Sequence, residues 1–211
     1  DPYNERDRLE VYFVDATSLL KGNRFFVDHS FKLNKNNPNS LVFTHQFNQE
    51  YKFFEFTQGF PSERFGDAFS TRINTKSRYN NLYNKVGVGY KTKNLGYLEF
   101  FIDDTNYNYY YNSVIYGVSG AIVVPNAISD RINMFGGNYT YFANKLTTKL
   151  QVTQAITNQA ISNVEATAKY AVSPDYQFEF QYQKLNSLPN LNFNLNQSSY
   201  VDYNWYNQFK N

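Results

Sequence analysis

The stretch Tyr176-Gln177-Phe178-Glu179-Phe180-Gln181-Tyr182-Gln183-Lys184 decides how this chain folds. Its even-numbered residues are aromatic up to position 182, and its odd-numbered residues are polar up to position 183. Successive side chains of a β-strand point to opposite sides, so the stretch predicts a strand with one aromatic and one polar face. Directly before it, Ser173-Pro174-Asp175 favours a tight turn, because proline presets φ and Asp hydrogen-bonds the turning backbone.

The same alternation recurs along the chain and predicts about ten strands. Residues 18–23 are expected to form a turn between the first two of them. Three stretches lose the alternation and carry Gly, Pro or Asn, so we expect long loops near 57–77, 112–130 and 186–197. Short and long connections then alternate, as in an up-and-down meander whose two ends differ in loop length. The strands are expected at about 8–13, 25–33, 41–56, 78–91, 95–111, 131–143, 145–154, 164–172, 176–184 and 200–209, with a short further one at 121–124.

The composition fits one all-β domain over residues 1–211. Aromatic residues make up 19% of the chain, and their rings suit a pleated surface. The formal net charge is +2 and the charges are scattered, so there is no basic stripe and nucleic acid is not an expected partner. The absence of Cys excludes disulfide frameworks and thiolate chemistry. A mean hydropathy of -0.61 is usual for soluble proteins, but a membrane barrel with a polar lumen has a similar average.

Strand length is the feature that separates a soluble sheet from a membrane barrel. No uninterrupted apolar run approaches the roughly 18 residues of a membrane-spanning helix. Soluble strands cluster near about 5–6 residues, whereas tilted membrane strands need about 9–11, and the predicted strands are of the longer kind. We therefore expect an all-β fold, an up-and-down antiparallel transmembrane β-barrel. The alternative is a soluble or surface-attached β-sheet module that binds glycans through its aromatic residues.

In a barrel the two faces of each strand would have different surroundings. The apolar face would contact lipid, and the polar face would line a lumen whose mixed charges influence which small solutes pass. The polar face is equally well explained as a merely solvated surface. The residues expected to face the lumen are Arg8, Glu10, Asp28, Lys32, Glu50, Lys52, Glu165, Lys169, Glu179 and Gln181. The residues expected to face lipid are Phe25, Val27, Phe31, Leu98, Phe100, Ile102, Phe178, Phe180, Tyr203 and Trp205.

None of the short motifs predicts catalysis. His29 and His45 fall in register with apolar residues, which favours a structural role. Ser18-Leu19-Leu20-Lys21 matches the Ser-x-x-Lys pattern of serine acyl-enzymes but lacks the companion motifs of those enzymes. Asp103-Asp104 offers oxygens to Ca²⁺ but lacks the EF-hand spacing, so solvation or hydrogen bonding between strands is its expected use. We expect no enzyme activity, no cofactor and no metal.

Three runs of the sequence resemble the putative porin family of Bacteroidota, especially of flavobacteria. The likeness extends along essentially the whole chain, and its motifs are structural phrases without catalytic residues. The runs are Val11-Tyr12-Phe13-Val14-Asp15-Ala16-Thr17-Ser18-Leu19-Leu20-Lys21-Gly22-Asn23-Arg24, Ser129-Asp130-Arg131-Ile132-Asn133-Met134-Phe135-Gly136-Gly137, and Leu188-Pro189-Asn190-Leu191-Asn192 leading to Ser198-Ser199-Tyr200-Val201-Asp202-Tyr203-Asn204-Trp205.

The resemblance implies a β-barrel in the bacterial outer membrane that passes small solutes, or a membrane component of a larger transport assembly. The expected partners are the lipid bilayer, small solutes and, in an assembly, other outer-membrane subunits. Family members are considerably longer and carry a signal peptide, so we expect this chain to be an internal portion of a larger barrel. A scaffold subunit whose barrel is occluded by loops such as 57–77 is a further hypothesis.

Overall fold

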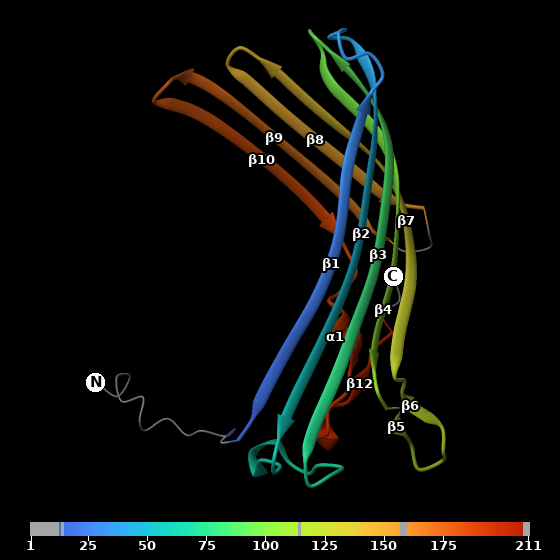
Figure 1. Ribbon diagram of the computed structural model, residues 1–211. Helices are drawn as coiled ribbons and strands as arrows, with labels where there is room; N and C mark the ends of the chain where they lie inside the picture. The colour runs from blue at the N-terminus through green and yellow to red at the C-terminus, as the bar shows by residue number, and fades with distance from the viewer. Residues whose placement is uncertain (1–12, 14, 114, 157–159, 209–211) are drawn as a thin grey trace, which may run out of the picture.

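The computed structural model describes residues 13, 15–113, 115–156 and 160–208, and its core is one antiparallel sheet (Figure 1). The eight strands of the sheet lie in chain order, each hydrogen-bonded to the next long strand of the sequence. This arrangement confirms the all-β, up-and-down antiparallel prediction. The strands are β1 (Thr17–Lys32), β2 (Ser40–Gln58), β3 (Ile73–Thr92), β4 (Gly96–Tyr111), β7 (Ala127–Ala143), β8 (Leu146–Ala155), β9 (Ser162–Ser173) and β10 (Tyr176–Asn186).

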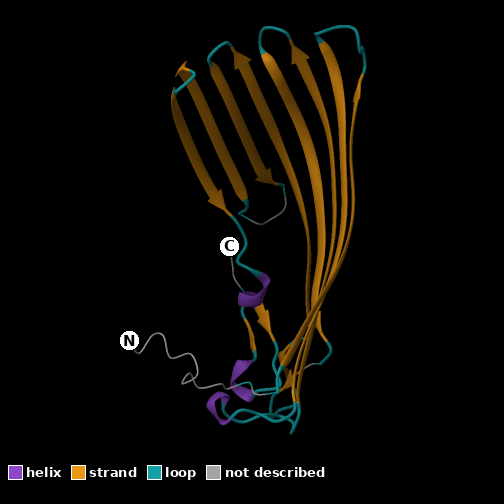
Figure 2. Cartoon of the chain, turned by 60° about the vertical axis from the view of Figure 1, so that its left-hand side comes forward, coloured by secondary structure: helices purple, strands orange, loops and turns teal. Residues whose placement is uncertain are grey.

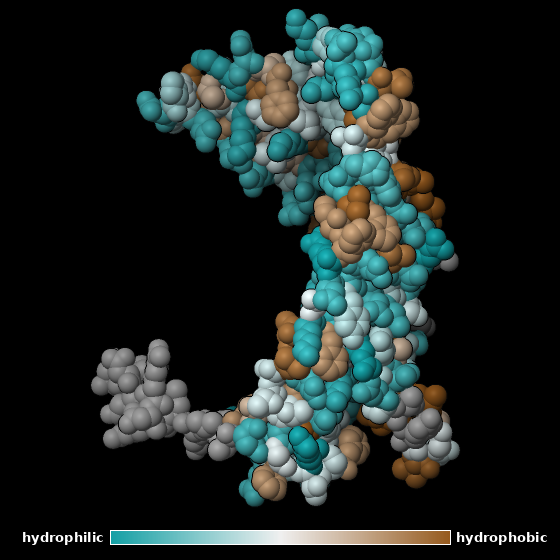
Figure 3. Space-filling model, in the orientation of Figure 1, coloured by the Kyte–Doolittle hydropathy of each residue, from teal (hydrophilic) through white to brown (hydrophobic). Residues whose placement is uncertain are grey.

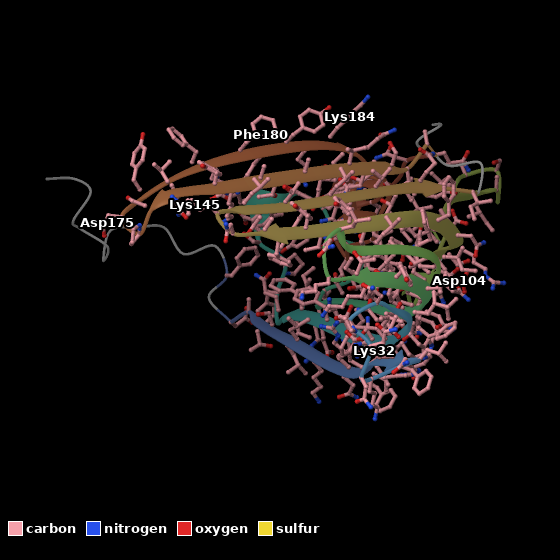
Figure 4. All side chains as sticks on the ribbon, turned by 90° about the horizontal axis from the view of Figure 1, so that it is seen from above. Lys32, Asp104, Lys145, Asp175, Phe180 and Lys184 are labelled. Carbon is pink, nitrogen blue, oxygen red and sulfur yellow. The ribbon has the colours of Figure 1, made fainter. Side chains whose placement is uncertain are left out.

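The sheet bends into an open arc whose two edges are β1 and β10 (Figures 1 and 4). One row of register partners crosses the whole sheet: Phe31, Phe43, Val88, Phe100, Gly137, Val152, Val164 and Lys184. Paired residues of an antiparallel sheet point to the same side, and Figure 4 shows that Lys184 and Phe180 point away from the hollow of the arc. The row therefore lies on the convex face, and the residues that alternate with it lie on the concave face.

The strands differ in length, so the arc is tall on one side and short on the other (Figure 2). The strands β1 to β4 and β7 have 16 to 20 residues, whereas β8 to β10 have 10 to 12. Short turns close one end of the sheet, and one of them needs Gly96, which has a φ of 84° and comes close to the Thr140 carbonyl of β7. The opposite end carries the longer connections 59–72 and 112–126, which include the hairpin β5 (Ile115–Tyr116) and β6 (Ile122–Val124).

Residues 187–208, which we call the inner segment, lie on the concave side near the long-loop end (Figures 1 and 2). The segment contains α1 (Leu191–Asn194), β11 (Leu195–Asn196), a 3₁₀ turn (Val201–Tyr203) and β12 (Trp205–Tyr206). Its Leu195 is fully buried and packs with Tyr109 and Tyr111 of β4 and with Val124 of β6. No helix in the described part of the chain is long and apolar enough to cross a membrane.

Several predicted boundaries were wrong. Residues 18–23 lie inside β1 and do not turn, because this strand pairs without interruption with β2 from Thr17 to Lys32. The predicted last strand at 200–209 is a 3₁₀ turn followed by the two-residue β12, because local asparagine and tyrosine hydrogen bonds replace a sheet partner there. The loop predicted at 57–77 spans only 59–72, and the one at 112–130 holds β5, β6 and the start of β7. The predicted strand at 8–13 lies almost wholly outside the described residues.

Candidate functional site on the concave face

The concave face collects the charged and amide side chains of the sheet. The lumen-facing predictions Asp28, Lys32, Glu50, Lys52, Glu165, Lys169, Glu179 and Gln181 all lie on this one face, as the strand register shows. The remaining two, Arg8 and Glu10, lie outside the described residues. Figure 3 shows polar residues over most of the side turned to the viewer and hydrophobic ones along the convex margin in the upper half.

Glu99 is the centre of the best-defined polar contact on this face. It is 6% exposed, and it accepts hydrogen bonds from Thr44 Oγ1 at 2.6 Å and from Asn138 Nδ2 at 2.8 Å. Its partners lie on β2 and β7, so the carboxylate of β4 ties together strands that are not all neighbours. Both contacts are hydrogen bonds to an ionised acceptor, which are stronger than neutral ones.

Gly87 makes the contact between Glu99 and Thr44 sterically feasible. The glycine lies on β3, between the strands that carry those two side chains. A Cβ at this position would lie 2.5 Å from Thr44 Oγ1 and 2.9 Å from Glu99 Oε1. These separations are shorter than real Cβ contacts, so any side chain here would push the bridge apart.

A second glycine makes room for an aromatic side chain on the concave face. A Cβ on Gly136 of β7 would lie 2.5 Å from Phe101 Cζ, so only glycine admits the ring at this position. Lys85 Nζ lies 3.8 Å from the centre of this ring, which is a close cation–π contact. Lys85 is also the register partner of the buried Asp103. The middle of the concave face thus combines a cation, a carboxylate and a ring.

The short side of the arc carries a different polar network. Lys169 Nζ lies 3.0 Å from Glu179 Oε2, and Gln181 Nε2 donates to Glu179 Oε1 at 2.6 Å. Next to them, Gln183 donates to Glu165 Oε1 at 3.0 Å. Carboxylate and ammonium groups are mixed on these strands, so the concave face has no strong single sign of charge within the described residues. A surface of this kind is hydrated and discriminates only weakly between cations and anions.

The convex face carries an apolar band next to the short turns. It includes Phe25, Phe31 and Leu33 at β1 and Leu98, Phe100 and Ile102 at β4, and its side chains are exposed, Phe100 and Phe180 each to 62%. On β3, β4 and β7 a polar row borders the band, formed by Asn84, Asp104 and Asn133 in mutual register, whereas on β1 and β2 the same row holds Val27 and Phe47. The lipid-facing predictions Phe25, Val27, Phe31, Leu98, Phe100, Ile102, Phe178 and Phe180 all lie on this face.

Two of the lipid-facing predictions do not lie in the sheet. Tyr203 and Trp205 belong to the inner segment on the concave side. The Tyr203 ring contacts that of Phe65, with centroids 5.9 Å apart, and Trp205 Nε1 donates to the Asn192 carbonyl at 3.0 Å. Their alternation with polar residues suggested a strand, but these local contacts hold the chain in short turns instead.

The carboxylates and histidines that could have served in metal binding or catalysis take part in structural contacts. Asp103 and Asp104 point to opposite faces, and Asp104 pairs with Arg131 at 2.6 Å, so the two carboxylates do not share a cation. The His29 and His45 rings contact each other on the convex face at a centroid separation of 5.0 Å. In the described ranges no group of His, Cys, Asp and Glu residues is placed to hold a metal ion.

Sequence reasoning missed the bridge at Glu99 and the anchors of the inner segment. The available signal for the bridge was Gly87-Val88-Gly89, in which glycine takes the polar positions of an otherwise regular strand. A glycine in a strand interior marks a close approach of other groups. The partners Thr44 and Asn138 are far from Glu99 in sequence, so they could not be identified from it.

Comparison with known proteins identifies the family of the chain. A family model described as putative porin matches residues 1–211, which is the whole chain. The comparisons with curated proteins and with solved structures found no match. An antiparallel meander with an apolar outer band and a polar inner face is the architecture that a porin wall requires. The chain therefore belongs to the putative porin family.

Proposed function

We propose that the chain forms the wall of a pore in a bacterial outer membrane, through which small polar solutes diffuse passively. The observation that carries the proposal is the separation of the two faces of one curved sheet. The convex face exposes an apolar band, and the concave face carries Glu99, Lys85, Asp103, Lys169 and Glu179. The apolar convex face is suited to contact with lipid, and the charged concave face is suited to contact with water.

The dimensions of the band support this proposal. From Phe25 to Leu33, which directly follows β1, the convex residues are apolar except for His29, and about 9 residues of tilted strand suffice to cross a bilayer. Below the band, β3 and β4 continue with polar residues on the convex face, such as Asn84, Asn106 and Asn108. These continuations would stand in water beyond the membrane, with the long loops at their ends.

The sheet has two free edges, which other strands must cover before it can enclose a pore. Within the described residues, β1 and β10 each have a strand partner on one side only. Unpaired backbone groups are costly in lipid, so membrane sheets close into barrels. We propose that further antiparallel strands cover both edges, supplied by the same polypeptide or by another outer-membrane subunit. The proposal gives the chain no catalytic role.

Reconstitution into planar lipid bilayers tests the function. We expect stepwise conductance in KCl that requires the folded protein, together with uptake of small sugars by liposomes that carry it. A matched pair of variants serves as control: Phe180→Arg on the convex face should reduce insertion, whereas Gln181→Arg on the concave face should insert normally. Extraction of the chain without detergent as a soluble monomer would contradict the proposal. Insertion without conductance would favour an occluded scaffold.

A further inference from the structure

We infer that the inner segment, residues 187–208, is a fixed constriction of this pore that filters small uncharged polar solutes by size. The inference rests on the proposed function and specifies which solutes it serves. Neither the sequence motifs nor the family likeness gives the residues of this segment a role in transport. Three observations carry it: the course of the segment across the arc, its anchors, and its chemical composition.

The inner segment crosses the hollow of the arc. It leaves β10 at Asn186, on the short side of the sheet, and reaches the long-loop end of β2, β3 and β4 on the tall side (Figure 2). The face that it contacts is the concave one, since its partners Tyr109 and Tyr111 lie on the same side of β4 as Glu99. When the barrel closes, a segment with this course lies inside the lumen.

The first group of anchors joins the segment to β4. The Tyr109 hydroxyl lies 2.9 Å from Asn192 Oδ1 and 2.7 Å from the Tyr111 hydroxyl, which in turn lies 3.2 Å from Asn196 Oδ1. Leu195 is 0% exposed between these groups. A hydrogen-bonded chain around a fully buried leucine holds this part of the segment against the wall.

The second group of anchors joins the segment to the loop 59–72 and to the end of β2. Tyr200 donates through its hydroxyl to Gln58 Oε1 at 3.1 Å and accepts from the Ser62 amide at 2.9 Å. Around it, backbone bonds of 2.9 Å run from the Phe69 amide to the Ser199 carbonyl and from the Val201 amide to the Asp67 carbonyl. Tyr200 itself is 6% exposed.

Internal hydrogen bonds make the segment rigid between its anchors. Asn204 Nδ2 donates to the Tyr200 carbonyl at 2.6 Å, and Asn204 Oδ1 accepts from the Ser198 amide at 2.8 Å. Asn196 Nδ2 donates to the Tyr203 carbonyl at 2.6 Å. A segment with buried anchors and bonds of its own has a high local cost of opening. It therefore acts as a fixed obstacle and not as a mobile gate.

The composition of the segment determines what it discriminates. From 187 to 208 the chain carries a single charged residue, Asp202, while asparagine, serine and aromatic residues predominate. Asn192 and Asn207 are exposed, and the amide groups that they do not use toward Tyr109 and the Phe193 carbonyl offer hydrogen bonds to neutral hydroxylated solutes. With so little charge, the constriction separates solutes mainly by size and much less by sign of charge.

A reversible cross-link provides the test. Ala68 and Tyr200 are partners in an isolated antiparallel bridge, with hydrogen bonds on both sides but none between the pair. Such pairs have Cα atoms about 4.5 Å apart, within the range that a disulfide spans. The chain contains no Cys, so Ala68→Cys with Tyr200→Cys provides the only two thiols. Leu195→Asp is added to weaken the other anchors, with Leu195→Ala in its place should the Asp variant not insert.

Single-channel conductance is measured before and after reduction of the same inserted protein. We expect a wild-type-like conductance while the disulfide holds the segment, an upward shift on reduction, and no response of the wild-type protein to the reductant. Reduction should also speed the uptake of larger neutral sugars into liposomes, with little change of the reversal potential in a KCl gradient.

Three results would overturn the inference. Failure of the cysteines to cross-link in the folded protein would contradict the position of the segment. Equal conductance in the oxidised and reduced states, with cleavage of the disulfide verified by mass, would contradict a constriction. A large shift of reversal potential would contradict a neutral filter. Absence of conductance from every form, including wild type, would instead refute the proposed pore itself.

Discussion

Substitution of Gly87 by alanine tests the polar bridge across β2, β3 and β4. The added methyl carbon would lie 2.5 Å from Thr44 Oγ1 and 2.9 Å from Glu99 Oε1, with the Phe100 carbonyl at 3.2 Å. Overpacking of a tight site costs about 1–3 kcal/mol, and loss of a hydrogen bond to a charged acceptor costs about 1.5–3 kcal/mol. The two costs overlap, because the same displacement relieves the clash and breaks the bond. We expect Gly87→Ala to lower the free energy of unfolding by about 3 kcal/mol.

Gly22→Ala is the matched control. Gly22 also lies on the concave face, but a Cβ there would meet only Tyr51 O at 3.5 Å and Lys52 Cγ at 3.8 Å. Neither Gly22 nor Gly87 has a positive φ, so alanine suits both backbones. Since alanine restricts the unfolded chain more than glycine, Gly22→Ala should be neutral or stabilise by up to about 1 kcal/mol.

Both variants are unfolded in urea in detergent micelles, with the folded fraction read from electrophoretic mobility. Glu99→Gln is then added to each background. In the Gly87→Ala background, Glu99→Gln should lower the free energy of unfolding by much less than in wild type, because the bridge is already broken. Equal stabilities of Gly87→Ala and Gly22→Ala, or an unchanged cost of Glu99→Gln, would refute the steric reasoning.

Three further predictions concern other parts of the molecule. Phe180→Arg should destabilise the folded protein in lipid by about 2–4 kcal/mol, while Gln181→Arg should leave its urea midpoint nearly unchanged; equal tolerance at both positions would contradict the facing of β10. Leu195→Ala should cost about 2–5 kcal/mol through a cavity and shift the fluorescence of the single tryptophan, and an unchanged spectrum would contradict the packing of the inner segment. Lys169→Glu places two carboxylates opposite each other at Glu179, so the reversal potential should move toward cation selectivity, whereas stability should change by only about 1 kcal/mol or less.

Local pattern was a good guide to the sheet and a poor guide to what lies inside it. The alternation at 176–184 identified β10, and its register with β9 reproduces the expected division of faces. The same reasoning failed at 200–209, where aromatic and polar residues also alternate. A strand forms only where a neighbour accepts its backbone hydrogen bonds, and the asparagine side chains of the inner segment satisfy the backbone locally instead.

The sequence by itself determined the all-β class, most strand positions in the sheet and the division of faces within those strands. These properties depend on period-two alternation, which is local and needs no knowledge of partners. Only the tertiary structure decided that Glu99 bridges Thr44 and Asn138 across the bare Gly87, and that the inner segment folds onto Tyr109 and Tyr111. Such contacts join residues that are far apart in the chain, and they exist because the curvature and register of the sheet bring them together.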